Sequence, residues 1–404
     1  QVLSRINVLE PERVPLLDSL GRVLAADVVS DIDVSPFDNS AMDGYAVRAS
    51  DVAGASPETP VTLEVVEHIP AGVAPTVHIG SRQAARIMTG APVPDGADAI
   101  VMVEKTRVGE GAGGPGETVE ILAASAQGEH IRRRAEEVRA GESVLLAGEL
   151  MGPAAIGLAA SVGHAEVSVR RKPRVAIVST GDELVGVTEK PGPGQIRNSN
   201  SYSLAAQVEW AGGEPHMLGV ARDTEAETRA LLGRAPEFDM MVTTGGVSMG
   251  DFDVVKKVLM EIGELDFWKV AMRPGAPQTF GTIGGTPFFG LPGNPTSTMV
   301  GFELFARPSI RKMIGFTTLV RPRVIATLAH DVKKKGDRRY FLRGRLTRTP
   351  EAGYSVAVSG NQSSALLTAM HRGNCLISLP EGQTEFAAGS QVMCIRLDVE
   401  EGTA

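Results

Sequence analysis

The sequence predicts a multidomain protein built around a doubly wound, mostly parallel α/β domain, and three observations lead to that prediction. The chain has 404 residues, more than a single ordinary core accommodates. Between residues 170 and 315, apolar stretches of strand length alternate with segments of helical spacing. The stretches before and after this segment show closely spaced strand-like runs, which indicates β-rich domains on either side.

The α/β segment shows its elements in order. RVAIVST at 174–180 is a continuous apolar run of strand length, and the helical spacing of 201–213 ends at a glycine pair. In such a sheet ligands bind at the carboxyl ends of the strands, here the loops STGDEL, VARD, TTGGVSMGDFD and GLPGNP. The remaining elements are strands at 216–221 and 239–246, helices at 226–235 and 253–263, and a strand, turn and helix over 286–306.

The flanking segments have a different pattern. Residues 60–145 contain alternating stretches such as VTLEVVEHI, separated by glycine and proline, which is typical of a small β-rich domain. After Pro322, five strand-like runs recur at roughly ten-residue spacing and predict a compact all-β domain.

Composition narrows the function. No apolar run approaches the roughly 18 to 20 residues of a membrane span, and the first residues lack a secretory signal, so we expect a cytoplasmic protein without a membrane partner. The net charge of −8 argues against nucleic-acid binding, and two isolated cysteines argue against a zinc site. Residues 321–404 nevertheless carry 12 Lys/Arg and 8 Asp/Glu. This cationic end could hold an anionic small molecule against the acidic remainder, or the charges could simply be scattered over the surface.

Two strand-end loops have the same composition. In STGDEL, a glycine follows the strand, and Asp182 with Glu183 could hold a divalent cation; acidic residues at a helix N-terminus are an equally good explanation. TTGGVSMGDFD likewise has glycines after a strand followed by acidic residues, and it is neither a Walker nor a GxGxxG motif. Its hydroxyls, glycines and carboxylates are those of Thr243, Thr244, Ser248, Gly245, Gly246, Gly250, Asp251 and Asp253.

Cations follow in the same segment. Lys269 and Arg273 lie four residues apart, and GLPGNPTS places prolines at a helix start, where they could complete an anion site or merely preset the helix. Earlier, DNSAMDGYA (38–46) and RIMTGAPVPDGAD (86–98) are either binding loops or turns, and the three arginines of IRRRAEE suit an oxyanion but also an exposed charge run. Together the strand-end loops predict a site for a phosphorylated ligand with a Mg²⁺-type ion, and no imidazole base accompanies them.

Seven stretches also resemble a known family. They are, in order, PFDNSAMDGYAVR, RIMTGAPVPDGADAIV, IRRRAEE, VAIVSTGDEL, VTTGGVSMGDFD, FWKVAMRPGAP and GLPGNPTS. They resemble the molybdopterin molybdenumtransferase family, MoeA, which includes the gephyrin E domain. The resemblance covers essentially the whole chain. It implies a transferase that inserts molybdate into adenylylated molybdopterin with Mg²⁺, releases AMP and forms the molybdenum cofactor.

The resemblance also implies an architecture and partners. It implies a homodimer, and possible contact with the adenylyltransferase that supplies the substrate. It divides the chain into a discontinuous linker and dimerisation domain (1–26 and 145–168), an inserted β-rich domain (27–144), the α/β molybdopterin-binding domain (169–317) and a C-terminal β-barrel (318–404). In such dimers Arg343 and Ser364 of the barrel are expected to face the α/β domain of the other subunit, and the 38–46 loop is expected to complete a site across the dimer.

Site residues are carried over position by position. The resemblance implies that Glu183, Asp223 and Asp253 hold Mg²⁺ or orient the ligand. The expected catalytic residues are Asp43, Thr89, Glu183, Asp223, Asp253, Lys269 and Arg273. The expected substrate-binding residues are Arg134, Glu137, Ser179, Thr180, Gly181, Gly245, Gly246, Ser248, Pro292, Gly293, Asn294, Pro295, Arg343 and Ser364.

Four positions depart from the family pattern. Arg273 and Ala276 stand where many relatives have Lys, Glu137 where Asp is usual, and Ser363 where Gly is common. These changes affect affinity more than reaction type, because the core carboxylates are kept. The alternatives are a pterin- or nucleotide-binding relative without metal insertion, a scaffold, and a non-catalytic paralogue. The absence of a long linker and of a fused domain argues against the scaffold. Retention of Glu183, Asp223, Asp253 and Lys269 argues against the paralogue.

Overall fold

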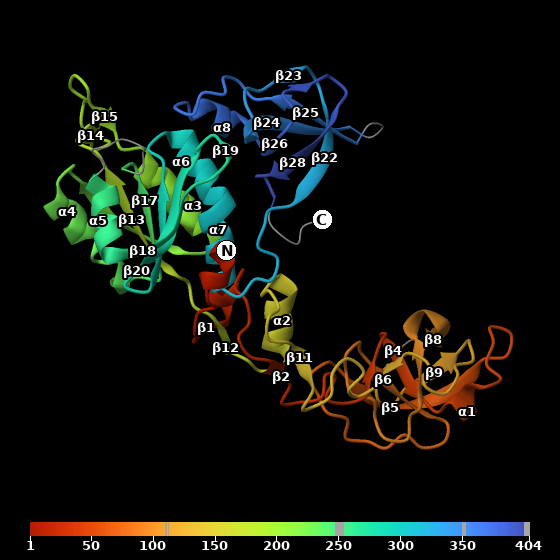
Figure 1. Cartoon of the computed structure of the whole chain (residues 1–404). Coiled ribbons are helices and arrows are strands. Elements are labelled where there is room, and N and C mark those ends of the chain that lie inside the picture. Colours follow the sequence, from red (N-terminus) through yellow and green to blue (C-terminus); the bar gives the residue numbers. More distant parts are fainter. Residues whose placement is uncertain (110, 112, 247–253, 350–352, 400–404) are drawn as a thin grey trace. The chain divides into compact units, whose positions relative to one another are not determined.

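The computed structural model describes residues 1–109, 111, 113–246, 254–349 and 353–399 (Figure 1). The predicted site residues Ser248 and Asp253, with Gly250 and Asp251, lie outside this part. The chain divides into two compact units, Gln1–Glu12 with Val169–Ala404 (unit 1) and Arg13–Ser168 (unit 2). The strands β1 (Pro11–Pro15) and β12 (Glu166–Arg170) span the two boundaries. None of the described helices is long and apolar enough to cross a membrane.

A six-stranded sheet forms the centre of the α/β domain in unit 1. Its order is β16-β13-β17-β21-β20-β18; the first four strands are parallel, β20 runs antiparallel to β21, and β18 runs antiparallel to β20. The apolar runs of the sequence account for the three inner parallel strands β13, β17 and β21, since strands covered on both faces are continuously apolar. The strands are β13 (Arg174–Thr180), β16 (Glu214–Ala221), β17 (Met240–Thr244), β18 (Gly263–Lys269), β20 (Pro277–Ile283) and β21 (Thr286–Leu291).

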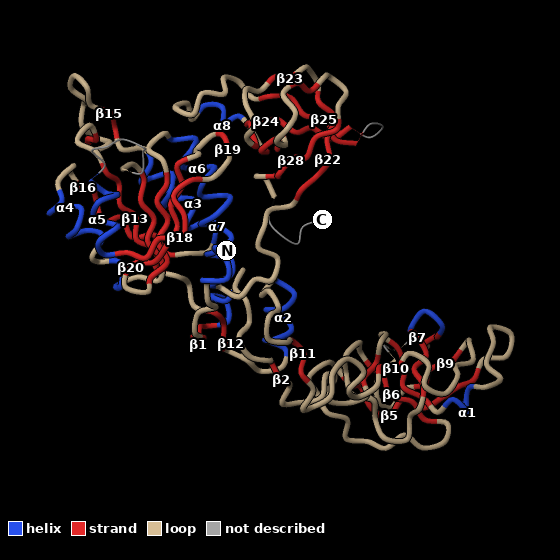
Figure 2. Tube along the Cα trace, viewed as in Figure 1, coloured by secondary structure: helices blue, strands red, loops and turns tan. Residues whose placement is uncertain are grey.

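Helices cover both faces of this sheet (Figure 2). On one face α3 and α7 pack with Ile177 and Val242 around the larger core, and on the other face α5 packs with Val178 and Met241. Gly212 ends α3 in the left-handed conformation that glycine favours. The helices are η1 (Val2–Arg5), α3 (Asn200–Ala211), α4 (Glu225–Leu232), η4 (Ala235–Glu237), α5 (Val254–Ile262), α6 (Pro295–Gly301), the π-helical η5 (Phe302–Ala306) and α7 (Arg307–Met313). A small pair, β14 (Leu184–Val185) and β15 (Ile196–Arg197), follows β13.

A closed five-stranded barrel forms the C-terminal region of unit 1. The order β24-β25-β22-β28-β26 closes because β26 also pairs with β24, which leaves no free edge among these strands. All five strand-like runs predicted after Pro322 are strands. The elements are β22 (Arg323–Leu328), β23 (Val332–Lys333), β24 (Arg339–Thr349), β25 (Gly353–Val358), α8 (Thr368–Arg372), β26 (Cys375–Leu379), β27 (Glu385–Phe386) and β28 (Gln391–Arg396).

The barrel is joined to the α/β domain by backbone pairing and by apolar contacts. The short strand β19 (Met272–Arg273) leaves the α/β domain and pairs in parallel with the start of β24. Met272 and Val300 also pack in one buried cluster with Phe341 and Met370. This joint places one end of the barrel against the strand-end loops.

Unit 2 is built around a separate six-stranded sheet, ordered β7-β4-β6-β5-β9-β8, in which only β5 and β6 pair in parallel. Position 44 on β4 requires glycine, because a Cβ there would come within 2.0 Å of the Val101 carbonyl oxygen. The elements are η2 (Leu16–Ser19), β2 (Val28–Val29), β3 (Asn39–Ser40), β4 (Gly44–Val47), α1 (Ala49–Val52), β5 (Val61–Ile69), β6 (Gln83–Ile87), β7 (Ala99–Met102), η3 (Val103–Lys105), β8 (Thr106–Val108), β9 (Thr118–Ile121), β10 (Ile131–Arg132), β11 (Ser143–Leu145) and α2 (Pro153–Ser161).

The predicted fold class is therefore confirmed in its central α/β domain, its β-rich domain and its C-terminal barrel. The antiparallel strands β18 and β20 were not predicted as strands. The predicted domain boundaries stay predictions.

Candidate functional site

A cleft of about 1880 Å³ opens in unit 1 where the strand-end loops of the α/β domain face the barrel. Sequence reasoning had placed the site at these loops. The predicted residues that line the cleft are Thr180, Gly181, Glu183, Asp223, Gly245, Gly246, Arg273, Pro292, Gly293, Asn294, Pro295, Arg343 and Ser364.

The glycine turns allow the strand ends to pack closely at one side of the cleft. Gly245 and Gly246 both have positive φ, and a Cβ on either would come within 3 Å of Thr180 or Val255. A Cβ on Gly293 would lie 3.6 Å from the Gly245 Cα, so these two loops meet backbone to backbone. The Thr180 hydroxyl oxygen is buried without a hydrogen-bond partner among the described residues. These turns leave exposed backbone that a phosphate can approach.

Asn200, at the start of α3, fastens the same loops together. Its amide nitrogen donates to Thr244 Oγ1 (2.8 Å), to the Gly293 carbonyl (2.7 Å) and to Thr298 Oγ1 (3.3 Å). The Thr244 hydroxyl donates in turn to the Pro292 carbonyl at 3.1 Å. One side chain therefore connects the ends of β17 and β21 with helix α6.

Two carboxylates lie on the α/β wall of the cleft. Glu183 and Asp223 are exposed, and within the described ranges neither side chain has an ion-pair or hydrogen-bond partner. Glu183 lies over Gly181, where a Cβ would come within 2.2 Å of a carboxylate oxygen. The backbone N–H of Asp223 donates to Asp182 Oδ1 at 3.3 Å, which positions the second carboxylate.

Cations lie across from them. Arg273 donates from Nη1 to the Tyr340 hydroxyl at 3.2 Å, with its guanidinium carbon 5.4 Å from the centre of the Tyr340 ring. Arg343 is 1% exposed, and its Nε has no hydrogen-bond partner among the described residues. Burial lowers the pKa of Arg343 to about 10, so its guanidinium is still charged at neutral pH. A buried cation without an acidic partner favours an anion at this place.

Arg343 and Ser364 lie beside the α/β domain of their own chain. The expectation that both face the α/β domain of another subunit stays a prediction. They line the cleft with the α/β domain of their own chain, because Thr296 N–H on α6 donates to the Ser364 carbonyl at 3.0 Å. The same chain therefore supplies both walls.

Two predicted residues of the α/β domain have other surroundings. The Ser179 hydroxyl is buried and bonds Ser201 Oγ at 2.7 Å and Asn198 Oδ1 at 3.1 Å, so its side chain is used inside the domain. Lys269 is exposed at the end of β18 and is not among the described residues that line the cleft. Ala276, one of the four positions that depart from the expected family pattern, lines the cleft with an apolar side chain.

The remaining predicted residues lie in unit 2. Asp43 Oδ1 accepts from both the backbone N–H and the hydroxyl of Thr89, each at 2.7 Å, and these bonds lower the pKa of Asp43. Arg134 donates from Nε to Asp33 at 2.5 Å, and Glu137 is exposed.

The oxygen donors of the cleft suit Mg²⁺. This ion binds through one or two carboxylates, keeps several waters and takes its other ligands from phosphates. Glu183 and Asp223 are two such carboxylates on adjacent strand ends. Among the described residues no three or more His, Cys, Asp or Glu side chains gather in one place.

Sequence reasoning missed several residues of the cleft. Asn200 and Asn198 come from RNSNS, a polar run before a helix whose density was a usable signal. His330, Lys335 and Arg338 come from the basic run after β22, and only the overall charge of the C-terminal segment pointed to them. Tyr340 could not be found, because its contact with Arg273 joins two domains.

Comparison with known proteins covers nearly the whole chain. Three family models match: "MoeA N-terminal region (domain I and II)" at residues 1–163, "Probable molybdopterin binding domain" at 176–312 and "MoeA C-terminal region (domain IV)" at 326–397. Molybdopterin molybdenumtransferase 2 of Mycobacterium tuberculosis is 42% identical over 97% of this chain and 96% of its own length. Molybdopterin molybdenumtransferase of Staphylococcus aureus is 38% identical over 97% of this chain and 92% of its own. The crystal structure of the molybdopterin biosynthesis protein MoeA from Pyrococcus horikosii superposes with a TM-score of 0.84 at 32% identity, covering 99% of this chain and 97% of that one.

Proposed function

Since this chain belongs to the molybdopterin molybdenumtransferase (MoeA) family, we propose that it inserts molybdate into adenylylated molybdopterin with the help of Mg²⁺ and releases AMP. It is a transferase of molybdenum cofactor biosynthesis. The adenylylated form of the substrate and the Mg²⁺ requirement are the parts that need a test.

The observation that carries the proposal is the charge arrangement of one cleft. Glu183 and Asp223, two carboxylates without a partner among the described residues, border the same cavity as the glycine turns, Arg273 and the buried Arg343. A ligand that has both phosphoanhydride oxygens and a bound divalent cation would complement both sets. A neutral ligand would leave the buried Arg343 without a counter-charge.

In the proposed reaction water cleaves the phosphoanhydride, the P–O bond to AMP breaks, and the two pterin thiols bind molybdenum as one molybdate oxygen leaves as water. We expect the backbone at Gly245, Gly246 and Gly293 to admit the anhydride, and Asn200 to hold these turns in register. Arg273 and Arg343 would neutralise the charge that gathers on the phosphoryl and molybdate oxygens. Asp253, outside the described residues, is proposed to act with the carboxylates.

Glu183 and Asp223 would hold the Mg²⁺ ion, which when bound withdraws charge from the phosphate oxygens. The other site residues would act by positioning the substrate and by neutralising charge. None of the predicted site residues is a histidine, and among the described residues His330 is the one histidine that lines the cleft.

The decisive experiment supplies purified protein with adenylylated molybdopterin, molybdate and Mg²⁺. We expect AMP release and molybdenum incorporation at equal stoichiometry, both lost on chelation of Mg²⁺ and restored by adding it back. AMP release that is indifferent to molybdate, with no metal incorporated, would contradict the molybdenum assignment and leave a nucleotide-cleaving relative.

We also propose that the protein is a homodimer. Four leucines in the predicted linker and dimerisation segments are at least half exposed, which is costly in water unless a partner covers them. They are Leu17, Leu20, Leu146 and Leu150. Light scattering after size exclusion is expected to give a mass of twice 42.5 kDa for the wild-type chain. The double variant Leu17→Glu with Leu150→Glu is expected to give the mass of the monomer. A monomeric wild-type chain would contradict the proposal. A pull-down with the adenylyltransferase tests the second proposed partner.

A further inference from the structure

The barrel wall of the cleft includes a basic segment that the proposed reaction does not use. It is HDVKKKGDRR, residues 330–339, between β22 and β24. Its residues that line the cleft are His330, Asp331, Val332, Lys333, Lys334, Lys335 and Arg338. Five cations in seven positions would ordinarily be regarded as a solvated run, so the contacts of each one matter.

Two of the five cations are neutralised by acids. Lys333 Nζ lies 2.8 Å from Glu385, its partner across the β23–β27 pair, and Arg339 Nη2 lies 2.9 Å from Glu381. A third, Lys334, is 5% exposed, and its ammonium donates to the Arg338 carbonyl at 2.9 Å. These three therefore have structural partners.

Lys335 and Arg338 are different. Neither side chain has an ion pair or hydrogen bond among the described residues, although both line the cleft. The acids beside them are occupied, because Asp337 Oδ1 accepts from the Gly382 N–H and Asp331 Oδ1 from the Ala388 N–H at 2.7 Å. Both nearby carboxylates therefore accept hydrogen bonds from backbone N–H groups, and Lys335 and Arg338 have no ion-pair partner among the described residues.

Tyr340 holds this turn beside the reaction site. Its hydroxyl donates to the Lys335 carbonyl at 2.6 Å and accepts from the Lys335 N–H at 3.3 Å. The same hydroxyl accepts from Arg273 Nη1 at 3.2 Å. Lys335 and Arg273 are therefore two hydrogen bonds apart, and the turn is built against a predicted catalytic residue.

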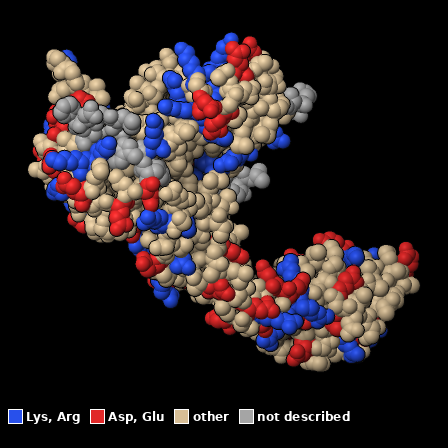
Figure 3. All heavy atoms as spheres, viewed as in Figure 1, with Lys and Arg blue, Asp and Glu red and all other residues tan. Residues whose placement is uncertain are grey.

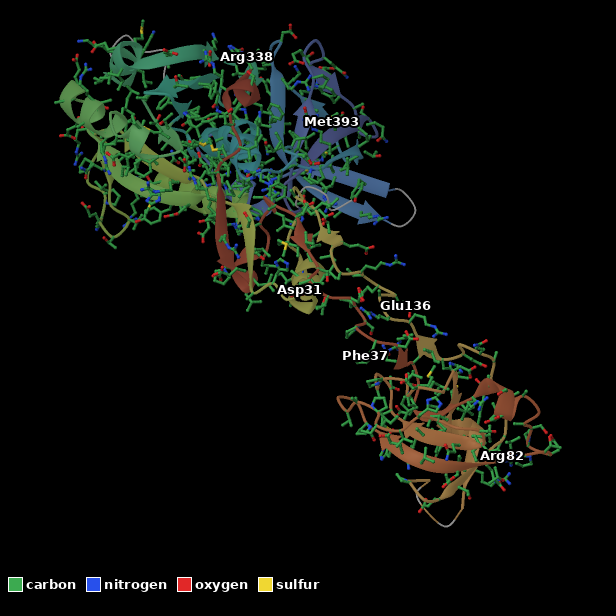
Figure 4. The ribbon with its side chains drawn as sticks, turned by 90° about the horizontal axis from the view of Figure 1, so that it is seen from below. Asp31, Phe37, Arg82, Glu136, Arg338 and Met393 are labelled. Carbon is green, nitrogen blue, oxygen red and sulfur yellow. The ribbon has the colours of Figure 1, made fainter. Side chains whose placement is uncertain are left out.

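We propose that Lys335 and Arg338 form a second subsite of the cleft, one that takes a tetrahedral oxyanion. This inference rests on the proposed function, because the subsite would bind a part of the substrate that the residues of the proposed reaction do not bind. That oxyanion is either a phosphoryl group of the bound nucleotide or a free ion such as molybdate before it reacts. Figure 4 labels Arg338 where the barrel borders the α/β domain.

Charge placement supports a subsite over a general attraction. Lys and Arg occur together with Asp and Glu over the face of the barrel seen in Figure 3, so the charge on that face is mixed. Exposed opposite charges in such a surface largely cancel beyond a Debye length of about 8 Å. An unpaired pair of cations inside a cleft acts at short range, where it can donate hydrogen bonds to one oxyanion.

The test compares two double variants of the full chain. Lys335→Gln with Arg338→Gln removes the subsite, while Arg345→Gln with Arg348→Gln removes the same charge from exposed barrel positions that do not line the cleft. Titration calorimetry with AMP, with inorganic phosphate and with molybdate alone measures affinity at low and at high salt. Molybdate-dependent turnover of the wild-type chain is measured on the same preparation.

We expect the subsite variant to bind at least one probe about tenfold more weakly, with a smaller dependence on salt, and the control to change less than about twofold. Loss with molybdate or phosphate alone identifies a free oxyanion as the occupant, and loss confined to AMP identifies the nucleotide phosphate. Unchanged affinity for all three probes, or an equal loss in the control, overturns the subsite even if wild-type turnover confirms the function. Absent turnover with the expected affinity loss would instead refute the function and keep the subsite.

Discussion

The polar loops of unit 2 and the cleft of unit 1 contain the same types of residue, but their charges are satisfied differently. In unit 2, Asp33 pairs with Arg134, and Asp38 accepts from the Arg134 N–H and pairs with Arg133 at 2.7 Å. In the cleft, Glu183, Asp223 and Arg343 have no partner of opposite charge among the described residues.

This difference separates two uses of charge that look alike as motifs. A carboxylate that already accepts backbone N–H bonds is part of a turn, and its pKa falls for that reason, as in Asp38. A group at a cleft that makes no such bond is available to a ligand. Asp43 lies between these cases, because it is exposed yet accepts two bonds from Thr89.

The largest expected effect tests the buried cation of the cleft. Arg343→Ala is expected to lower kcat/KM by at least about 100-fold, because the charge that opposes the transition-state oxyanions is lost. The unfolding midpoint is also expected to fall, because the substitution leaves a cavity at a buried side chain and removes the bond from Nη2 to the Ser363 carbonyl at 3.4 Å. Steady-state kinetics and thermal unfolding measure the two, with Arg345→Ala as the exposed control. An active variant would assign Arg343 to structure.

The carboxylate wall is expected to give the next largest effect. Glu183→Gln removes a charge but keeps the shape, so the Mg²⁺ concentration for half-maximal rate should rise about tenfold or more. Titration of activity with Mg²⁺ measures it. Glu264→Gln, exposed on β18 and not among the residues that line the cleft, is the control. An unchanged Mg²⁺ curve would mean that Glu183 does not hold the ion.

Asn200→Ala tests whether the cleft is held together by its own polar groups. The variant loses the bonds to Thr244, Gly293 and Thr298 and is expected to lower the free energy of unfolding by about 2 kcal/mol and to raise KM more than it lowers kcat. Chemical denaturation and kinetics check this, against Asn7→Ala at an exposed position. Equal stability of the two variants would show that Asn200 does not fasten the loops.

The smallest effect concerns Asp43 in unit 2. The Thr89 N–H contributes more to its lowered pKa than the hydroxyl, so Thr89→Val should raise the Asp43 pKa only part of the way to 3.8. Because the folded pKa is lowered, this carboxylate stabilises the fold above about pH 4 and loses that contribution as the pH falls through its folded pKa. An NMR titration of the carboxyl groups measures the Asp43 pKa in the wild-type chain and in the variant, with Asp38 as the internal reference. A full return to 3.8 would remove the backbone bond from the explanation.

Much of the fold could be predicted because its signals are local. RVAIVST predicts β13 residue for residue, and five strand-like runs predict the five strands of the barrel. The antiparallel strands β18 and β20 escaped prediction because GELDFWK and PQTFGTI are mixed in polarity, although they are as long as RVAIVST.

The sequence by itself determined the strand-end loops, their glycines and their carboxylates, because strand length, glycine spacing and charge are properties of short segments. Only the tertiary structure decided which charges remain unpaired. Lys333 and Lys335 are two positions apart in one basic run and both line the cleft, yet Lys333 pairs with Glu385 and the Lys335 side chain has no ion-pair partner among the described residues. Whether a charge finds a partner depends on residues far away in the chain, and only folding brings them together.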